Sequence, residues 1–551
     1  MKQVLRRLIV PAFLLALFIF NNPDIACAED AKNEKTSFIS GRISEFTLPE
    51  SEYEQLRRGM TRASDSLALD FCINGSEPLD FGDGNWYYVL HEGDPLAADP
   101  VFSLSSGAED ARLYVCGGID DTMLSGKGEL RFMVCSGQKC SSYVLRCRSL
   151  PQMFLYTESS IEREYIPGHM RFYDNRAELT EHWIDSDMKI HVRGASSWHF
   201  DKKSYKLALT MEEGGRTVPR HEALLGLRKD DDWLLYAGYN DPDRVRNVFC
   251  AKLWKECSSS GNGMEYKYIE LYLNDNYCGL YALGYPLDAK QLRIGKSEFG
   301  QTGEYLYKSR IAPQSNENPM LKEGFSIEGG AIRGDGSEWE PLLDYLDWME
   351  ALRAGDIGGI YERVDVESAI DMYLFVNLIQ GLDNIDKNYY LSYKKIDGEY
   401  KMRFTPWDFD LCWGSRWDAR YRNCTWAYAF EPDKHILSDT NPVHYYLESG
   451  DQHMLCLVCR RYDELRGGAW SDDNINALLD GYERDIFTSG AYRRDLRAWP
   501  KSSVKYGTED LTRFREYVMQ RLEYMDEYIR TLSASIEFST YDTMKHIKLP
   551  G

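Results

Sequence analysis

Four acidic or amide side chains in one short stretch of the chain have the types and spacing that hold a divalent cation. Asp383 and Asn388 lie in the loop Asp-Asn-Ile-Asp-Lys-Asn, and Asp408 and Asp410 lie in the segment Pro-Trp-Asp-Phe-Asp. Carboxylate and amide oxygens are the ligands that Mg²⁺ prefers, and a separate carboxylate can accept the proton of an attacking hydroxyl. Phosphoryl transfer needs this combination of groups.

The elements around these four side chains predict that they meet. The apolar spacing over residues 366–380 indicates a helix that stops at Gly381. Residues 389–395 and 399–405 have the pattern of two strands joined by the turn Asp397-Gly398. Because the arms of a hairpin have similar length, residues just before the first arm lie beside residues just after the second. We therefore expect all four side chains at one end of the hairpin.

The order of helix, Asp-x4-Asn loop, hairpin and Asp-Phe segment also occurs in protein kinases. There the first Asp is the catalytic base, and the Asn and the second Asp hold magnesium. An EF-hand interpretation fails because the loop from Asp383 lacks a glycine at position six and a final Glu. A weaker alternative is that Asp408 and Asp410 are the paired carboxylates of a glycosidase, although their closeness in sequence does not fix that geometry.

The composition bounds the class of protein. The chain has 551 residues, of which 43% are hydrophobic, and a formal net charge of −22. These values describe a globular protein whose surface repels a phosphate backbone, so we expect no nucleic-acid partner. Residues 1–28 have a basic start, a short apolar run and an Ala-Cys-Ala end, which predicts a cleaved secretory signal and an extracytoplasmic protein. After cleavage we expect no transmembrane anchor, since no later run is long and apolar enough.

The remaining chain is predicted to divide into four parts. We expect a polar linker with a short helix over residues 29–66 and a small all-β, sandwich-like domain over 67–150, where short β-forming runs alternate with turns. A main domain over 151–535 and a tail over 536–551 follow. The main domain mixes strands with helices, which predicts the α+β class. Its other expected helices begin at Asp241-Pro242 and cover 339–352 and 510–532, and its expected strands cover 189–192, 204–209, 266–273 and 280–283.

Of the 13 cysteines, Cys27 would leave with the signal, and the other twelve would lie in a compartment that permits disulfides, so that up to six bridges are possible. Cysteines that are close in sequence are candidates, but the sequence leaves their pairing open. These pairs are Cys135/Cys140, Cys250/Cys257, Cys412/Cys424 and Cys456/Cys459.

Four blocks of sequence, in order, resemble the CotH family, the spore-coat-protein-H-like atypical kinases, from about residue 151 to about residue 532. One block is the Asp-x4-Asn-Tyr-Tyr run with the Pro-Trp-Asp-Phe-Asp segment described above. The others are Arg193-Gly194-Ala195-Ser196-Ser197 followed by residues 202–207, Trp233-Leu234-Leu235 with Asp241, Arg246 and Asn247, and Asn274 with residues 279–283.

The resemblance implies a divergent, two-lobed protein-kinase-like fold. It implies transfer of the γ-phosphoryl group of ATP, with Mg²⁺ or Mn²⁺, to Ser or Thr hydroxyls of protein substrates. Asp383 would be the catalytic base, Asn388 and Asp408 metal ligands, and Asp410 a second ligand or an orienting group. Trp407 is expected to pack beside the nucleotide. The negative charge of the chain favours basic, Ser-containing acceptor segments.

Phosphate contacts are expected from two further places. Arg193, Ser196 and Ser197 lie in a Gly-containing turn between two strands, which suits an anion. Lys206 lies on the polar face of its strand, and the resemblance favours it as a phosphate contact. Lys308, after a run of apolar residues, is its rival.

Two positions depart from the pattern of the family. Ala195 stands where Asn is usual, and Tyr285 stands where Glu is usual, with Glu270 or Asp288 as candidate replacements for that Glu. These departures favour an alternative function, a catalytically impaired kinase-fold scaffold at a surface or in a coat that acts by binding proteins. A weaker alternative is an extracellular carbohydrate-active enzyme, suggested by the 13 tryptophans.

Overall fold

The computed structural model describes twelve stretches of the chain. Within them the chain forms two compact units, the first made mainly of residues up to Met153 and the second of most residues after it. Helices and strands both occur, and strands dominate the N-terminal unit, which confirms the α+β class. The predicted signal peptide over 1–28 lies outside the described residues. These residues are 37–74, 76–80, 84–90, 100–117, 129–195, 197–295, 303–310, 324–332, 334–385, 387–415, 441–500 and 509–537.

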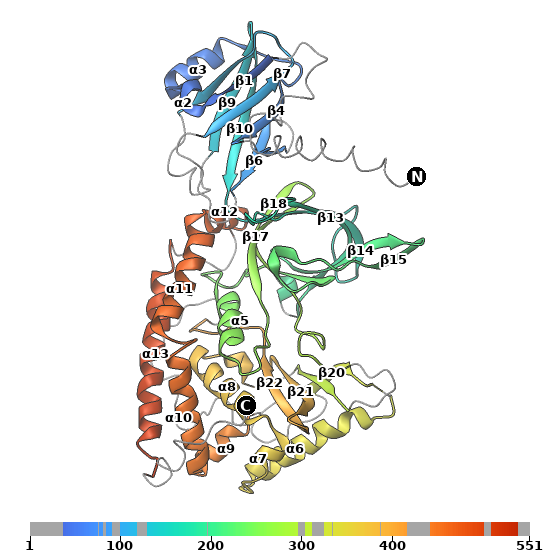
Figure 1. The fold of residues 1–551 in the computed structure, drawn as a ribbon, viewed down its shortest axis with the longest axis vertical. Coiled ribbons are helices and arrows are strands. Elements are labelled where there is room, and N and C mark those ends of the chain that lie inside the picture. The colour runs from blue at the N-terminus through green and yellow to red at the C-terminus, as the bar shows by residue number, and fades with distance from the viewer. Residues whose placement is uncertain are drawn as a thin grey trace, which may run out of the picture. The chain divides into compact units, whose positions relative to one another are not determined.

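The first unit contains two sheets whose inner faces share one core (Figure 1). Aromatic rings fill this core, and the ring of Phe71 in one sheet stacks on that of Trp86 in the other with centroids 4.8 Å apart. The smaller sheet has the order β1 (Ser37–Arg42), β7 (Val101–Ser106), β4 (Ala68–Ile73). The larger has the order β2 (Thr47–Leu48), β8 (Arg112–Cys116), β9 (Glu129–Ser136), β10 (Lys139–Arg148), β6 (Asn85–Val89), β5 (Leu79–Asp80), with β3 (Thr61–Arg62) also paired to β10.

The segment 29–66, expected to be a polar linker with a short helix, contains helices and paired strands from residue 37 onward. Strand β1 pairs with β7 along its whole length, and two helices follow it, α2 (Ile43–Phe46) and α3 (Glu50–Arg58). Ile43 and Tyr53 are buried in the unit. The segment looks polar because each short element has one exposed face. The partner of β1, strand β7, also lies far away in the sequence.

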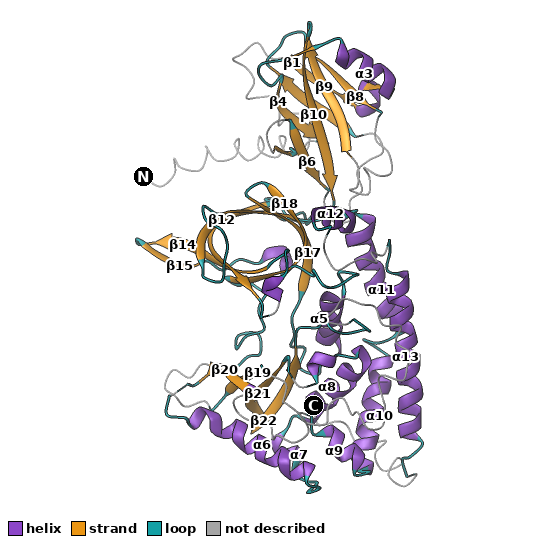
Figure 2. Cartoon of the chain, turned by 180° about the vertical axis from the view of Figure 1, so that it is seen from behind, coloured by secondary structure: helices purple, strands orange, loops and turns teal. Residues whose placement is uncertain are grey.

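The second unit begins with a sheet that closes on itself (Figure 2). Because β13 pairs with both β12 and β14, the strands form a ring, and β15 is left outside it. Helix α5 (Arg246–Cys257) lies between β16 and β17 in the sequence. The strand order is β13 (Trp183–Arg193), β12 (Ile166–Tyr173), β11 (Gln152–Tyr156), β17 (Tyr266–Leu273), β18 (Asn276–Gly284), β16 (Asp232–Tyr236), β14 (Ser204–Glu213), β15 (Arg216–Pro219).

The rest of the second unit is a four-stranded sheet with helices (Figure 1). The predicted helix and hairpin are present almost as expected, as α8 (Val366–Ile379), β21 (Tyr389–Ile396) and β22 (Glu399–Pro406). The sheet order is β20 (Phe325–Gly330), β19 (Tyr305–Ser309), β21, β22. The other helices are α6 (Glu340–Arg353), α7 (Ile360–Arg363), α9 (Val443–Glu448), α10 (Gln452–Arg466), α11 (Asp472–Tyr482), α12 (Ala491–Ala498) and α13 (Thr512–Ser533). Among the described residues, no helix has the length and apolar character that crossing a membrane requires.

The helix expected from Asp241-Pro242 begins later, at Arg246. The Asp241 carboxylate accepts hydrogen bonds from the Arg246 backbone N–H at 2.8 Å and from the Asp243 backbone N–H at 3.1 Å. The acid therefore satisfies an N–H group at the start of α5, as a helix cap does, but it does so from a loop several residues upstream.

No disulfide joins two of the described cysteines. Cys135 and Cys140 lie directly opposite each other on β9 and β10, as their closeness in sequence suggests. Cys250 does not pair with Cys257, because its sulfur lies next to that of Cys412. Cys424 is outside the described residues.

A buried ion cluster fixes α12 to the closed sheet. The Asp495 carboxylate accepts hydrogen bonds from Lys202 Nζ at 2.7 Å, Arg244 Nε at 3.0 Å and the Leu280 backbone N–H at 3.0 Å, and all three charged side chains are almost fully buried. A Cβ atom at Gly279 would lie 2.2 Å from the same carboxylate, so only glycine fits there. Buried cations need such a partner, because they have lost their water.

We predict that Asp495→Ala strongly destabilises the second unit. The substitution leaves two buried cations without their carboxylate, which lowers the free energy of unfolding by about 3–5 kcal/mol. Thermal unfolding followed by circular dichroism measures the effect. Asp480→Ala is the matched control, because Asp480 is 71% exposed in its ion pair with Arg515 and such a pair contributes about 0–1 kcal/mol. Equal melting temperatures for the two variants would contradict the prediction.

Candidate active site

Helix α8 ends one residue earlier than its sequence indicates. Gln380, with φ 52°, is the left-handed residue that closes the helix, whereas Gly381 has φ −73°. Glycine is still required at 381, because a Cβ atom there would lie 2.8 Å from Oδ1 of Asn384. The helix end and the loop that carries Asp383 are thus packed tightly together.

The side chain of Asn384 connects the two parts of the site. This buried amide donates hydrogen bonds through Nδ2 to the backbone oxygen of Asn388 at 3.0 Å and to that of Trp407 at 2.8 Å. The Trp407 N–H also donates to the Asn388 oxygen at 3.0 Å. The loop before β21 and the segment after β22 are therefore held side by side. Sequence reasoning named Asn388 and overlooked Asn384, although both lie in the same loop.

The segment after β22 is also held by α5 and α8. Asn247 on α5 accepts the Phe409 N–H at 2.9 Å, and the fully buried Arg246 donates to the Cys412 oxygen at 3.2 Å. The Trp413 N–H donates to the last residue of α8, Ile379, at 2.7 Å. The segment from 408 to 413, called the acidic turn below, has its backbone fixed on both sides.

Backbone strain is concentrated at this site. Gln380, Asn388, Asp408 and Trp413 all have positive φ angles, between 48° and 62°, and none is glycine. A non-glycine residue in this region carries strain, and such residues cluster where the surrounding structure imposes a functional geometry.

Asp383, Asp408 and Asp410 lie near enough to one another to interact electrostatically. Burial raises the pKa of the Asp408 carboxyl, and the charge of Asp383 raises it further. Burial and the charge of Asp408 raise the pKa of Asp410 to about 7, although a hydrogen bond from Asn240 at 3.1 Å opposes this rise. Such crowding of carboxylates favours a bound proton or cation.

Three cations from different elements oppose these carboxylates. Arg193, at the end of β13, and Lys308, on β19, both lower the raised pKa of Asp408, as does Lys387 from the loop. Lys387 forms an ion pair with Asp383 at 2.9 Å. The side chain of Asp383 is 29% exposed, so solvent and other molecules can reach it.

An aromatic group lies beside Lys308. Its Nζ atom lies 4.1 Å from the ring centroid of Trp407 and 5.5 Å from that of Tyr390, and burial lowers the pKa of its ammonium. Trp407 Nε1 is buried and has no hydrogen-bond partner among the described atoms. The Tyr236 hydroxyl, whose pKa is raised by burial and by Asp410, is likewise without a partner there.

The other expected phosphate contacts lie in different surroundings. The Lys206 ammonium forms an ion pair with Asp232 at 2.9 Å on the closed sheet, and no interaction connects it to the three carboxylates among the described residues. Ser197 begins a short 3-10 helix after Gly194, whose φ is 109°, and Ser196 is outside the described residues. Lys308, the second lysine that the sequence suggests, is the one near Asp408.

A family model described as CotH kinase protein matches residues 190–525, well over half of the chain. The chain belongs to the CotH family. This confirms the resemblance found in the four sequence blocks. A search of the curated proteins gave no match.

The departures from the CotH pattern can now be located. Tyr285, in the place of the usual Glu, is buried with the Arg228 guanidinium 4.6 Å from its ring centroid. Glu270 is fully buried and accepts two hydrogen bonds from Arg494. Asp288 raises the pKa of Tyr390 and accepts a hydrogen bond from the Gln291 N–H.

Sequence reasoning did not name Glu328 on β20. Burial lowers the pKa of Lys308, and the charge of Glu328 is the largest influence that opposes this lowering.

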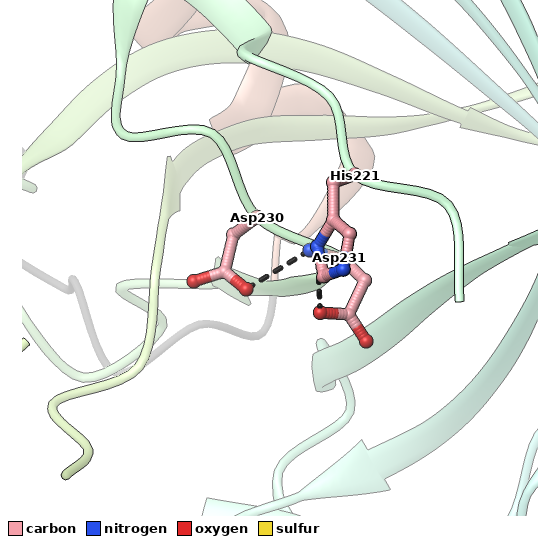
Figure 3. A group of neighbouring side chains, drawn as sticks. All are labelled: His221, Asp230 and Asp231. Carbon is pink, nitrogen blue, oxygen red and sulfur yellow. Dashed lines mark hydrogen bonds and ion pairs between the residues drawn. The ribbon is translucent and has the colours of Figure 1, made fainter. Parts of the chain in front are cut away.

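A second group of side chains that could hold a metal ion lies in the loop before β16, within the region matched by the CotH family model (Figure 3). It contains His221, Asp230 and Asp231, with ligand atoms within 4.8 Å of one another, and it is the one such group among the described residues. Asp230 already forms ion pairs with Arg228 and with Lys290, the latter at 2.8 Å. Because Arg228 and Lys290 already neutralise Asp230, we interpret this group as part of an ion-pair network and not as a metal site.

We predict a pH-dependent effect of Asp410→Asn. In the native protein the pKa of Asp410 is about 7, so the carboxyl keeps its proton up to about that pH, whereas an unfolded aspartate has the ordinary pKa of 3.8. The native state therefore binds more protons between these values, and this group destabilises the fold as pH rises from about 4 to 7. The melting temperature of Asp410→Asn relative to wild type should rise over this range without divalent cations. Asp397→Asn, at the far end of the hairpin, is the control, and a constant difference for Asp410→Asn would contradict the assignment.

Proposed function

We propose that this CotH family member is a protein kinase that transfers the γ-phosphoryl group of ATP to Ser or Thr hydroxyls in the presence of Mg²⁺ or Mn²⁺. The observation that carries the proposal is the meeting of Asp383, Asp408 and Asp410 opposite Arg193 and Lys308. Acids that can hold a metal, facing cations that can hold phosphates, are what this reaction needs.

The acidic turn suits a divalent cation. Asp408 and Asp410 offer hard oxygen ligands, and their raised pKa values reflect burial and mutual repulsion that a cation would relieve. Asn388, whose backbone is fixed beside Trp407, would supply an amide oxygen. When bound, the metal would neutralise charge on the phosphates of ATP.

Asp383 is suited to the acceptor hydroxyl. Its side chain is 29% exposed, and its ion pair with Lys387 holds the carboxylate in position. A charged carboxylate within reach of a hydroxyl can orient it and accept its proton.

Lys308, Arg193 and Trp407 are suited to the nucleotide. Lys308 and Arg193 both act on the charge of Asp408, as does Lys387, and this supports Lys308 rather than Lys206 as the phosphate contact. The Trp407 ring beside Lys308 offers a flat aromatic surface to a purine. Glu328 would hold Lys308 in place.

The acceptor would be a protein with basic segments around a serine. The formal charge of −22 attracts such segments and repels acidic ones. With the secretory signal expected from the sequence, the kinase would act outside the cytoplasm, on a surface or coat protein.

We predict different effects for two substitutions in the site. Asp383→Asn should lower transfer from radiolabelled ATP to histone or protamine by about 10²–10⁴-fold, because it removes the base, while nucleotide binding remains. Asp408→Asn should abolish Mg²⁺-dependent nucleotide binding, read as the loss of the rise in melting temperature that Mg-ATP causes. Asp397→Asn, the control from the other end of the hairpin, should behave as wild type.

Two results would contradict the proposal. Unchanged transfer by Asp383→Asn would remove that residue from catalysis. Absence of both transfer and nucleotide binding in the wild type would favour the alternative of a kinase-fold scaffold, which the change at Tyr285 also suggests.

We predict that the two candidate lysines differ. Lys308→Ala should weaken Mg-ATP binding at least tenfold, because it removes a cation that faces the acidic turn. Lys206→Ala should leave the affinity within about twofold of wild type, since its ammonium is already paired with Asp232. Isothermal titration with a non-hydrolysable ATP analogue measures both. The reverse order of effects would show that Lys206 is the phosphate contact.

A further inference from the structure

Two cysteine sulfurs meet directly behind the acidic turn. The Sγ atoms of Cys250 and Cys412 lie 3.5 Å apart, and both side chains are fully buried. A disulfide has an S–S distance of about 2.05 Å, so the two sulfurs must move about 1.5 Å closer to bond. The two residues lie 162 positions apart in the sequence, which is why the pair was not suggested by spacing.

The position of this pair connects the two elements that hold the site. Cys412 belongs to the acidic turn and follows Asp410 by two residues, and Cys250 lies on α5 one turn after Asn247. Trp413 Nε1 donates to Cys250 Sγ at 3.1 Å, and the Cys412 thiol donates to the Phe409 oxygen at 2.8 Å, a hydrogen bond that a disulfide would replace. A covalent bond here would act on the backbone that carries Asp408 and Asp410.

We propose that Cys250 and Cys412 form a disulfide when the chain folds in an oxidising environment, and that this bond locks the acidic turn onto α5. The oxidant would be a disulfide-bearing compound, either oxidised glutathione or a thiol–disulfide oxidoreductase. One cysteine thiolate attacks the oxidant and releases a thiol, and the second thiolate then attacks the mixed disulfide and releases another. Two S–H bonds are replaced by one S–S bond, and the oxidant is reduced to two thiols. The proposal holds with or without phosphoryl transfer.

The burial of both sulfurs determines when the bond can form. Neither side chain is accessible in the folded protein, so an external disulfide cannot reach them. Exchange must occur before α5 and the acidic turn have packed together, and the finished bond is then protected from reduction. The disulfide would therefore form during folding and persist in the folded protein.

Peptide mapping of the full-length protein tests the proposal without any substitution. The protein is refolded in a mixture of oxidised and reduced glutathione, free thiols are blocked with iodoacetamide, and trypsin is added without reductant. Cys250 lies in the tryptic peptide 247–252 and Cys412 in 404–416, and each peptide contains a single cysteine. We expect a cross-linked mass that separates into these two peptides on reduction. Recovery of both as singly alkylated peptides, or of Cys250 linked to another cysteine, would overturn the proposal.

Stability measurements provide a second readout. The bridge closes a loop of about 160 residues, so the oxidised protein should melt about 5 °C or more above the protein refolded in dithiothreitol. Cys250→Ala and Cys412→Ala should each reduce this difference by the same amount. Cys257→Ala, which alters a buried cysteine on the same helix, should leave it unchanged. An undiminished difference in Cys250→Ala, or an equal reduction in Cys257→Ala, would also overturn the proposal.

Discussion

Mutual repulsion among three carboxylates is the constraint on which the site depends. Asp383, Asp408 and Asp410 raise one another's energy when charged, and burial of the acidic turn increases this effect. They can stay together only where the backbone is fixed and cations lie opposite. Asn384 joins the loop to the segment after β22, and Asn247 and Arg246 hold the acidic turn from α5. The strained φ angles at Asn388 and Asp408 indicate how strongly this geometry is imposed.

The closed sheet and the four-stranded sheet both contribute to the site. Arg193 comes from β13 of the closed sheet, Lys308 from β19 of the other, and the carboxylates from the ends of the hairpin β21–β22. Parts of the sequence blocks that resemble the CotH family thus have a structural explanation. Arg246 and Asn247 position the acidic turn, and Gly279 makes room for Asp495 in the ion cluster that fixes α12.

Local elements were predictable to within a few residues, because they depend on spacing along the chain. The helix α8 and the hairpin β21–β22 follow from apolar periodicity and from the Asp397-Gly398 turn. Predictions that needed long-range partners were less accurate. The pattern of residues 37–42 does not reveal strand β1, because its partner β7 is far away in the sequence. The sequence favours both Lys206 and Lys308, and the structure separates them by the Asp232 carboxylate beside Lys206 and by the action of Lys308 on Asp408.

The sequence by itself determined which groups could carry chemistry, since residue type and hairpin symmetry bring Asp383, Asn388, Asp408 and Asp410 to one end of β21 and β22. It also determined the family, through blocks in a fixed order. The tertiary structure decided which cations face these acids, that Glu328 accompanies Lys308, and that Cys250 meets Cys412. The physical reason is that periodicity describes neighbours within one element, whereas burial and charge pairing depend on elements that meet only after the sheets and helices have packed.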